Sequence, residues 1–456
     1  MLKTLTSLPR CFGVLAVASL LVLVVPNASA QRADNPPELS EKVQSGIAPL
    51  SKLFEEKKWD EALVSIDGLI SKVDAVSFDR AFLAGLKAQI YGSKGDYVGA
   101  IPPLEDMLKV ADQLKLFRFT RVLPVNEQDA VINLASLYLQ DAGTPGKTID
   151  QQRALYAKAH MYGKRLVEGK KPTPEAQTMW ARILFSEATI DPSKIDMTIM
   201  KQAADEADKA LHLVVKPRED HYTLYLACLQ QLGDNVKSAE MLELMVKLFP
   251  NNKNFWPLLF NTYVALQGAG DKTADISAVI ALERAQAAGQ MVSNKDNFML
   301  AGLYYNIQQY EFAAELLEKG LRNGKIDPDQ KNWELLAASY QQMSKDARAI
   351  EVFKEAIKLF PKSANLELQV GQILYNTDKH PEAYIHLQAA VSKGLDKPGQ
   401  TLLLISYLAL EMKRLDEALV AAEKALAADP KSKQAQDILK VVKDSIEERE
   451  KFKNQK

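Results

Sequence analysis

The stretch that decides the fold runs from Trp333 to Pro361 and reads WELLAASYQQMSKDARAIEVFKEAIKLFP. Its apolar residues first recur every three or four positions, as far as Tyr340, which is the spacing of one helix face. A polar break follows, and a second apolar stripe starts at Ile350. Pro361 ends that stripe, because proline cannot donate the next helical hydrogen bond. The stretch therefore predicts two short antiparallel helices.

The same spacing returns along the chain. With Gln330 as position 1, large residues stand at positions 4, 11 and 24 and small residues at positions 8, 20 and 27. These are Trp333, Tyr340 and Phe353, and Ala337, Ala349 and Ala356. Units of this kind start at residues 219, 253, 295, 330, 364 and 399, and one spacing of 42 contains an insertion around 267–275. Small residues let two helix backbones approach, and aromatic residues fill the gaps between helix pairs.

A period near 34 with this pattern of large and small residues resembles the tetratricopeptide repeat (TPR). The resemblance implies an all-α fold, a right-handed superhelical solenoid of about ten antiparallel helix pairs with a C-terminal capping helix. We expect degenerate TPR-like repeats over 31–109, irregular helical repeats over 110–218 and a regular TPR array over 219–432. The capping helix and a charged tail would occupy 433–456, with one apolar stripe made by Ala435, Ile438, Leu439, Val442 and Ile446. A separate helical domain inserted over 110–218 is the alternative.

The first thirty residues predict a signal peptide. Lys3 and Arg10 precede an unbroken apolar run over 11–25, and Ala28-Ser29-Ala30 is an A-x-A cleavage signal. The run is shorter than the roughly 20 residues that a membrane-spanning helix needs. We therefore expect export to the periplasm, cleavage after Ala30 and a mature chain that begins at Gln31. An uncleaved membrane anchor is the alternative.

Composition limits the kinds of partner. The chain has 57 Lys and Arg against 58 Asp and Glu, and loss of Lys3 and Arg10 lowers its net charge from −1 to −3. No basic excess points to nucleic acid, and no second apolar run predicts membrane insertion of the mature chain. Cys228 is the one cysteine left after cleavage and lies in an apolar helical segment. We expect it to be a buried packing thiol.

The sequence contains no recognisable catalytic pattern. Its five histidines are scattered and lack metal-ligand spacing: His160, His212, His221, His380 and His386. Neither a phosphate-binding Gly-rich loop nor a G-x-S-x-G motif is present. The carboxylate pairs in WDEA (59–62) and LDEA (415–418) predict an Asp that caps a helix and a Glu in its first turn. We expect a non-enzymatic protein without cofactor or metal. An enzyme with a site within 110–218 is the alternative from another class.

In the family that the chain resembles, positions 2, 5, 6, 9, 12 and 13 of the first helix line a concave groove. Here these positions are rich in amides, with apolar residues such as Leu300 and Leu303 between them. The amides are Gln230, Asn254, Asn261, Asn306, Gln341, Gln342, Gln369, Gln372 and Asn376. Amides can donate to and accept from a peptide backbone, which predicts a protein partner bound as an extended or helical segment. The alternative is that they only keep the face soluble. The family's carboxylate clamp needs Lys, Arg and Asn at positions 2, 5, 6 and 9, and the chain mostly lacks it.

A narrower resemblance concerns three segments, at residues 39–63, 78–101 and 314–342. They are similar to secreted bacterial TPR proteins whose genes often accompany TonB-type energy-transduction components. This resemblance implies a periplasmic adaptor near an outer-membrane uptake system. A scaffold for envelope assembly or polysaccharide export is the alternative within the same class. The sequence does not predict the oligomeric state.

Overall fold

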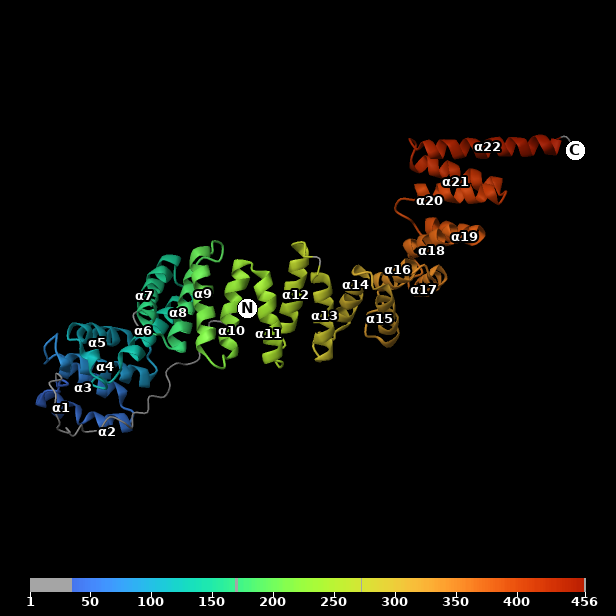
Figure 1. Cartoon of the computed structure of the whole chain (residues 1–456). Helices are drawn as coiled ribbons and strands as arrows, with labels where there is room; N and C mark the ends of the chain where they lie inside the picture. The colour runs from blue at the N-terminus through green and yellow to red at the C-terminus, as the bar shows by residue number, and fades with distance from the viewer. Residues whose placement is uncertain (1–34, 169–170, 272, 455–456) are drawn as a thin grey trace. The chain divides into compact units, whose positions relative to one another are not determined.

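The computed structural model describes residues 35–168, 171–271 and 273–454, so the expected signal peptide lies outside the described residues. All regular secondary structure in these ranges is helical (Figure 1). Helices that follow one another in the chain pack side by side, and most reverse direction at a short loop. The expected all-α class and its architecture of successive helix pairs are confirmed.

The chain divides into two compact units, Met1–Met245 and Val246–Lys456, which we describe separately. Unit 1 contains α1 (Glu41–Ile47), α2 (Leu50–Glu55), α3 (Trp59–Ile70), α4 (Phe78–Lys94), α5 (Ile101–Gln113), the short 3₁₀ helix η3 (Leu116–Arg118), α6 (Glu127–Ala142), α7 (Ile149–Val167), α8 (Pro174–Ala188), α9 (Met197–Leu213), α10 (Glu219–Leu232) and most of α11 (Asn235–Leu248). Unit 2 contains α12 (Phe255–Gly268), α13 (Ala274–Ala287), α14 (Asn294–Asn306), α15 (Tyr310–Asn323), α16 (Gln330–Gln342), α17 (Asp346–Leu359), α18 (Ala364–Asn376), α19 (His380–Ser392), α20 (Gly399–Glu411), α21 (Leu415–Ala428) and α22 (Lys433–Asn454).

The helices alternate between a first helix and a second helix of each pair, which we call A helices and B helices. The A helices are α4, α6, α8, α10, α12, α14, α16, α18 and α20, and each is followed by its B helix. Helices α10, α16, α18 and α20 begin at residues 219, 330, 364 and 399, the starts predicted from the repeat. The opening stretch forms α16 and α17, as predicted. Between residues 110 and 218 the chain forms the pairs α6/α7 and α8/α9, which belong to unit 1.

Burial in unit 2 explains the spacing of the opening stretch. Ala337, Ala349 and Ala356 are 0% exposed, because they stand where α16 and α17 approach each other. Phe353 and Trp333 are also buried and join the same apolar cluster. Burying an aromatic side chain removes a large apolar area from water, at about 25 cal/mol per Å². The buried positions of the small and the large residues therefore agree with the roles that the repeat pattern predicts for them.

Helix starts are specified locally, although two of them differ from expectation. Ser363 accepts a hydrogen bond from the backbone N–H of Leu366 and caps α18. In WDEA and LDEA, by contrast, the predicted Asp caps are wrong. The N-cap residues are Lys58 and Arg414, so Asp60 and Asp416 lie inside the first turn of α3 and α21. There the carboxylates still favour the helix, because its N-terminal end carries partial positive charge.

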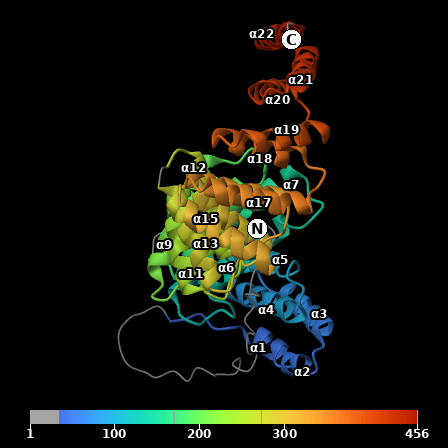
Figure 2. The same ribbon diagram turned by 90° about the vertical axis from the view of Figure 1, so that its right-hand side faces the viewer.

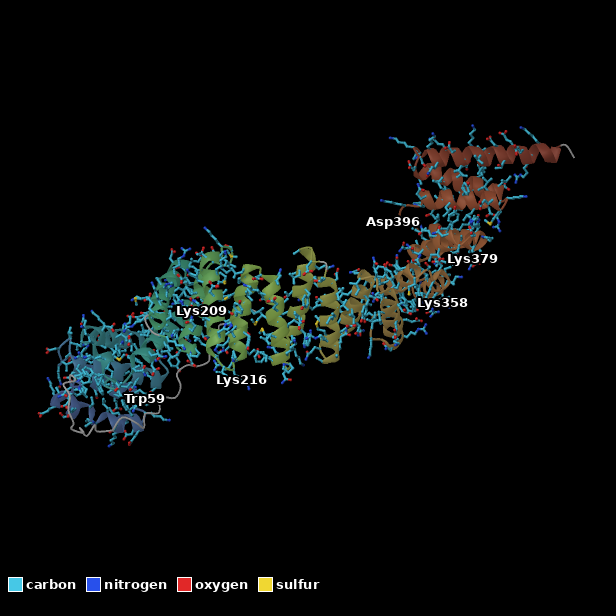
Figure 3. All side chains as sticks on the ribbon, in the orientation of Figure 1. Trp59, Lys209, Lys216, Lys358, Lys379 and Asp396 are labelled. Carbon is cyan, nitrogen blue, oxygen red and sulfur yellow. The ribbon has the colours of Figure 1, made fainter. Side chains whose placement is uncertain are left out.

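Helix α22 covers the end of unit 2. It packs against α21 and α20, which lie one beside the next in Figure 2. Ala435 and Val442 are buried, and Ile438 and Ile446 pack against the main cluster of the unit. The predicted apolar stripe is therefore the face that closes the stack. Elsewhere, long polar side chains such as Lys358 project outward (Figure 3). None of the described helices combines the length and the apolar character that crossing a membrane requires.

Candidate functional site

The amides predicted from the repeat lie on the A helices and are open to solvent. Seven are exposed, and Gln341 and Gln369 are half-buried. The exposed ones are Gln230, Asn254, Asn261, Asn306, Gln342, Gln372 and Asn376. None of the nine side chains makes a hydrogen bond within the described part of the chain. Each can therefore both donate to and accept from a ligand without first breaking an internal contact.

The structure brings the amides of α16 and α18 onto neighbouring helices. Asn365 Nδ2 on α18 donates to Glu334 Oε1 on α16 over 3.0 Å, so the first turns of these helices lie side by side. Gln330 Nε2 donates to the same oxygen over 2.8 Å. The two A helices run in the same direction, and seven residues make about two helical turns. Gln341 and Gln372, each seven residues further on, therefore also face neighbouring positions.

Other amides are distributed over more of the chain. Gln230 lies on α10 in unit 1, whereas the remaining eight belong to unit 2. Within unit 2, Asn306 ends α14, which contacts α16. Asn261 lies near the middle of α12. We call the exposed side of α12, α14, α16, α18 and α20 the A-helix face. That this face forms a concave groove stays a prediction.

Two apolar residues expected on this face are buried instead. Leu300 and Leu303 on α14 are 4% and 9% exposed. They pack in a cluster with Phe260, Val279 and Leu282 from the preceding pair, α12 and α13. The position in the repeat predicts the direction of a side chain but not the size of its neighbours. Here the large neighbouring side chains bury this part of α14. The face is therefore not uniformly apolar between the amides.

Sequence reasoning missed the contribution of α20. Tyr407 on this helix is 53% exposed, although tyrosine is a large side chain that usually buries its ring. Its neighbours Leu403 and Leu404 are half-buried. Tyr407 stands at position 9 of the unit that starts at residue 399, the position that Asn261 and Gln372 occupy in theirs. The same position rule would have found it.

One charged residue of α18 is buried and paired, unlike the exposed neutral amides of the A-helix face. Glu367 on α18 is 6% exposed and accepts hydrogen bonds from His386 Nδ1 at 2.6 Å and Lys393 Nζ at 2.7 Å, both from α19 and its end. Burial alone would raise the pKa of the Glu367 carboxyl, but the Lys393 and His386 contacts outweigh burial and hold that pKa below its usual value. The carboxylate is therefore a structural charge that joins two helices.

Three of the histidines are paired with carboxylates rather than grouped together. His160, His380 and His386 each contact a carboxylate of a neighbouring helix, and no group of three or more metal-ligand side chains occurs among the described residues. Cys228 is fully buried, and burial raises the pKa of its thiol to about 12. The thiol stays protonated at neutral pH, which suits the packing role expected for it.

No family model matches the chain, and the search of curated proteins found no match. Solved structures give matches in fold. PilF from Pseudomonas aeruginosa is 19% identical, with 51% of this chain and 97% of that chain covered and a TM-score of 0.31. YrrB, described as a TPR protein with an unusual peptide-binding site, is 16% identical over 44% of this chain and 99% of its own, with a TM-score of 0.33. The Cut9–Hcn1 hetero-tetramer of the APC/C is 12% identical, with 88% of this chain and 96% of that chain covered and a TM-score of 0.28.

Proposed function

We propose that the chain is an exported, non-enzymatic adaptor that binds a segment of a partner protein along the A-helix face of unit 2. The observation that carries the proposal is the set of solvent-exposed amides without internal hydrogen bonds on the A helices, of which α14 contacts α16 and α16 is hydrogen-bonded to α18. A repeat array with such a face presents an extended surface rather than a pocket, and extended surfaces suit peptide segments.

The chemistry of the face favours a partner's backbone as well as its side chains. Each amide supplies a carbonyl acceptor and two N–H donors, which match the donors and acceptors of an extended peptide. Half-buried Leu335 and Leu368, together with exposed Tyr407, add apolar area beside the amides. We propose that the amides fix the register of the bound segment and that the apolar side chains contribute most of the binding free energy.

Two features support export and the cellular setting. The basic start, apolar run and A-x-A sequence over 1–30 favour delivery to the periplasm, where the partner would be met. The resemblance of residues 39–63, 78–101 and 314–342 to secreted TPR proteins associated with TonB-type systems supports a role near an outer-membrane uptake system. We propose that setting for the adaptor.

The experiment replaces four amides from four consecutive A helices by alanine: Asn261, Asn306, Gln342 and Gln372. The partner is first captured from the periplasm by crosslinking, and its affinity for the full chain is measured by calorimetry. Each lost hydrogen bond should cost on the order of 1 kcal/mol, so the four together should weaken binding by up to a few hundredfold. Circular dichroism should show an unchanged fold, because these side chains are exposed and make no hydrogen bonds within the described part of the chain.

A matched control changes four exposed residues on B helices of the same unit to alanine: Lys354, Lys358, Glu423 and Lys424. This variant should bind the partner as the original chain does. Full affinity in the folded amide variant would show that the amides only solvate the face, and the proposal would then be wrong.

A further inference from the structure

A second surface lies in unit 1, on the loop between α5 and α6. Residues 114–126 read LKLFRFTRVLPVN and contain three cationic residues and no acidic residue. Lys115, Arg118 and Arg121 are all exposed. The chain as a whole has nearly equal numbers of cations and anions, so a segment of this composition concentrates positive charge at one place.

The loop is held in place from inside. Leu116 and Val125 are buried, and Phe117 packs against the cluster that includes Ala81 of α4. Gln89 Nε2 on α4 donates to the carbonyl oxygen of Pro124 over 2.9 Å. The cations are therefore presented on a fixed backbone, which lowers the entropy lost when a ligand binds.

Arg165 of α7 neutralises the carboxylates at both ends of the loop. Its guanidinium donates two hydrogen bonds of 2.7 Å to Asp112, the penultimate residue of α5, and one of 2.8 Å to Glu127, the first residue of α6. Hydrogen bonding to these carboxylates raises the pKa of Arg165 despite its partial burial, so it is charged at any physiological pH. Other nearby carboxylates also have partners: Arg80 binds Asp106, and Asn126 binds Asp129. The side chains of Lys115 and Arg121 make no ion pair or hydrogen bond within the described part of the chain, so these two cations keep their charge for an external ligand.

The backbone of the loop turns sharply at two of its cations. Lys115 and Arg121 have φ angles of 52° and 59°, in the left-handed region that non-glycine residues rarely adopt. Glycine or asparagine would be more favourable there for the backbone alone. Between them, the Arg118 guanidinium lies 4.7 Å from the centre of the half-buried Phe119 ring. The loop therefore places two cations at left-handed turns and an arginine–aromatic pair between them.

We propose that the loop over 114–126 is a docking site for an acidic segment of a partner protein, separate from the A-helix face. Arginine and aromatic residues are enriched at protein interfaces, and positive charge on a fixed loop complements a run of carboxylates. An anionic membrane fits less well. Membrane-binding basic clusters usually hold four to eight cations, and this loop holds three, with Phe117 turned into the core.

The test uses the full chain and two fluorescent probes, a twelve-residue peptide of alternating Glu and Ser and its Gln–Ser counterpart. At about 0.02 M salt, fluorescence anisotropy should show binding of the Glu peptide and none of the Gln peptide, because screening is weak at that ionic strength. The variant K115Q/R121Q should bind the Glu peptide about tenfold more weakly, from the usual strength of exposed ion pairs.

The matched control is K57Q/K201Q. Lys57 is an exposed lysine with a φ of 53°, so it has the same unusual backbone as Lys115, and Lys201 is exposed on α9. This variant should bind the Glu peptide as the original chain does. Equal loss in both variants would show a nonspecific charge effect, and equal affinity of K115Q/R121Q and the original chain, or no binding of the Glu peptide at all, would overturn the proposal.

Vesicles with about one-third phosphatidylglycerol distinguish a lipid from a protein partner. The proposal expects the original chain and K115Q/R121Q to sediment with them equally. Vesicle binding that is lost in K115Q/R121Q, without binding of the Glu peptide, would assign the loop to an anionic membrane and reject the proposal. None of these outcomes depends on the A-helix face, so the adaptor function is tested independently.

Discussion

Two glycines at the same repeat position should respond oppositely to alanine. Gly371 on α18 and Gly302 on α14 both stand at position 8, where the repeat calls for a small residue. A Cβ atom at residue 371 would lie 2.7 Å from Cγ and Cδ2 of Leu387 and 3.2 Å from its backbone nitrogen. Leu387 is 0% exposed and belongs to the core of unit 2. A Cβ atom at residue 302 would meet no atom within 4 Å.

The magnitudes follow from these contacts. Alanine in a helix is favoured over glycine by about 0.8–1 kcal/mol, so Gly302→Ala should raise the free energy of unfolding by about that amount. At residue 371 the same gain is opposed by overpacking, which costs about 1–3 kcal/mol. The cost should be near the upper end, because the Leu387 backbone cannot move without shifting α19 against α18. We therefore expect Gly371→Ala to be destabilising by about 1–2 kcal/mol.

Urea unfolding of the full chain, followed by circular dichroism, measures both variants under the same conditions. Gly302→Ala is the matched control, since it changes the same residue type at the same repeat position. The two variants should differ by about 2–3 kcal/mol in the transition that reports unit 2. If both variants gained stability equally, α18 and α19 would not be in close contact at residue 371, and the explanation of small residues at position 8 would fail.

Three further predictions concern a buried charge, the end of the stack and export. Glu367→Gln removes the carboxylate that His386 and Lys393 share and should lower the free energy of unfolding by about 2 kcal/mol at pH 7. Because the pKa of Glu367 is lowered in the folded state, this contribution is complete above its unfolded pKa, near 4.3, and is lost as the pH falls through the folded value, so thermal melts of the two proteins should converge in acid. Truncation after Pro430 removes α22, exposes the apolar face that it covers and should lower the melting temperature and promote aggregation; an unchanged melt would make α22 a free tail. Mass spectrometry of the envelope fraction should find a mature N-terminus at Gln31, and an intact Met1 in membranes would indicate an anchor instead.

The repeat pattern predicted what depends on local periodicity. Helix starts near residues 330, 364 and 399, the buried alanines of the opening stretch and the exposure of the amides all follow from position within a unit of about 34 residues. These features could be predicted because every repeat packs against its neighbours in the same way, so a given position has the same environment in most units.

Features that depend on particular neighbouring residues could not be predicted from the sequence. Position 4 of a repeat is a large apolar residue in Trp256, Trp333 and Leu402, so a carboxylate at this position, Glu367, gives no sign of its role. Its partners are 19 and 26 residues away in the sequence. Arg165 likewise joins carboxylates 53 and 38 residues distant. No sequence periodicity links these residues, because their contacts form only when the helices pack together.

The two proposed surfaces use different interactions, and the salt dependence of binding should distinguish their contributions. Hydrogen bonds from neutral amides to a peptide backbone carry no net charge, whereas contacts of Lys115 and Arg121 with carboxylates are screened over about 10 Å at 0.1 M salt. The captured partner should therefore bind the original chain more weakly as salt rises from about 0.05 to 0.5 M. The alanine variant of Asn261, Asn306, Gln342 and Gln372 should keep that salt dependence at a lower affinity, and K115Q/R121Q should lose most of it. An equal salt dependence in both variants would place the charged contacts of this partner on another surface of the chain.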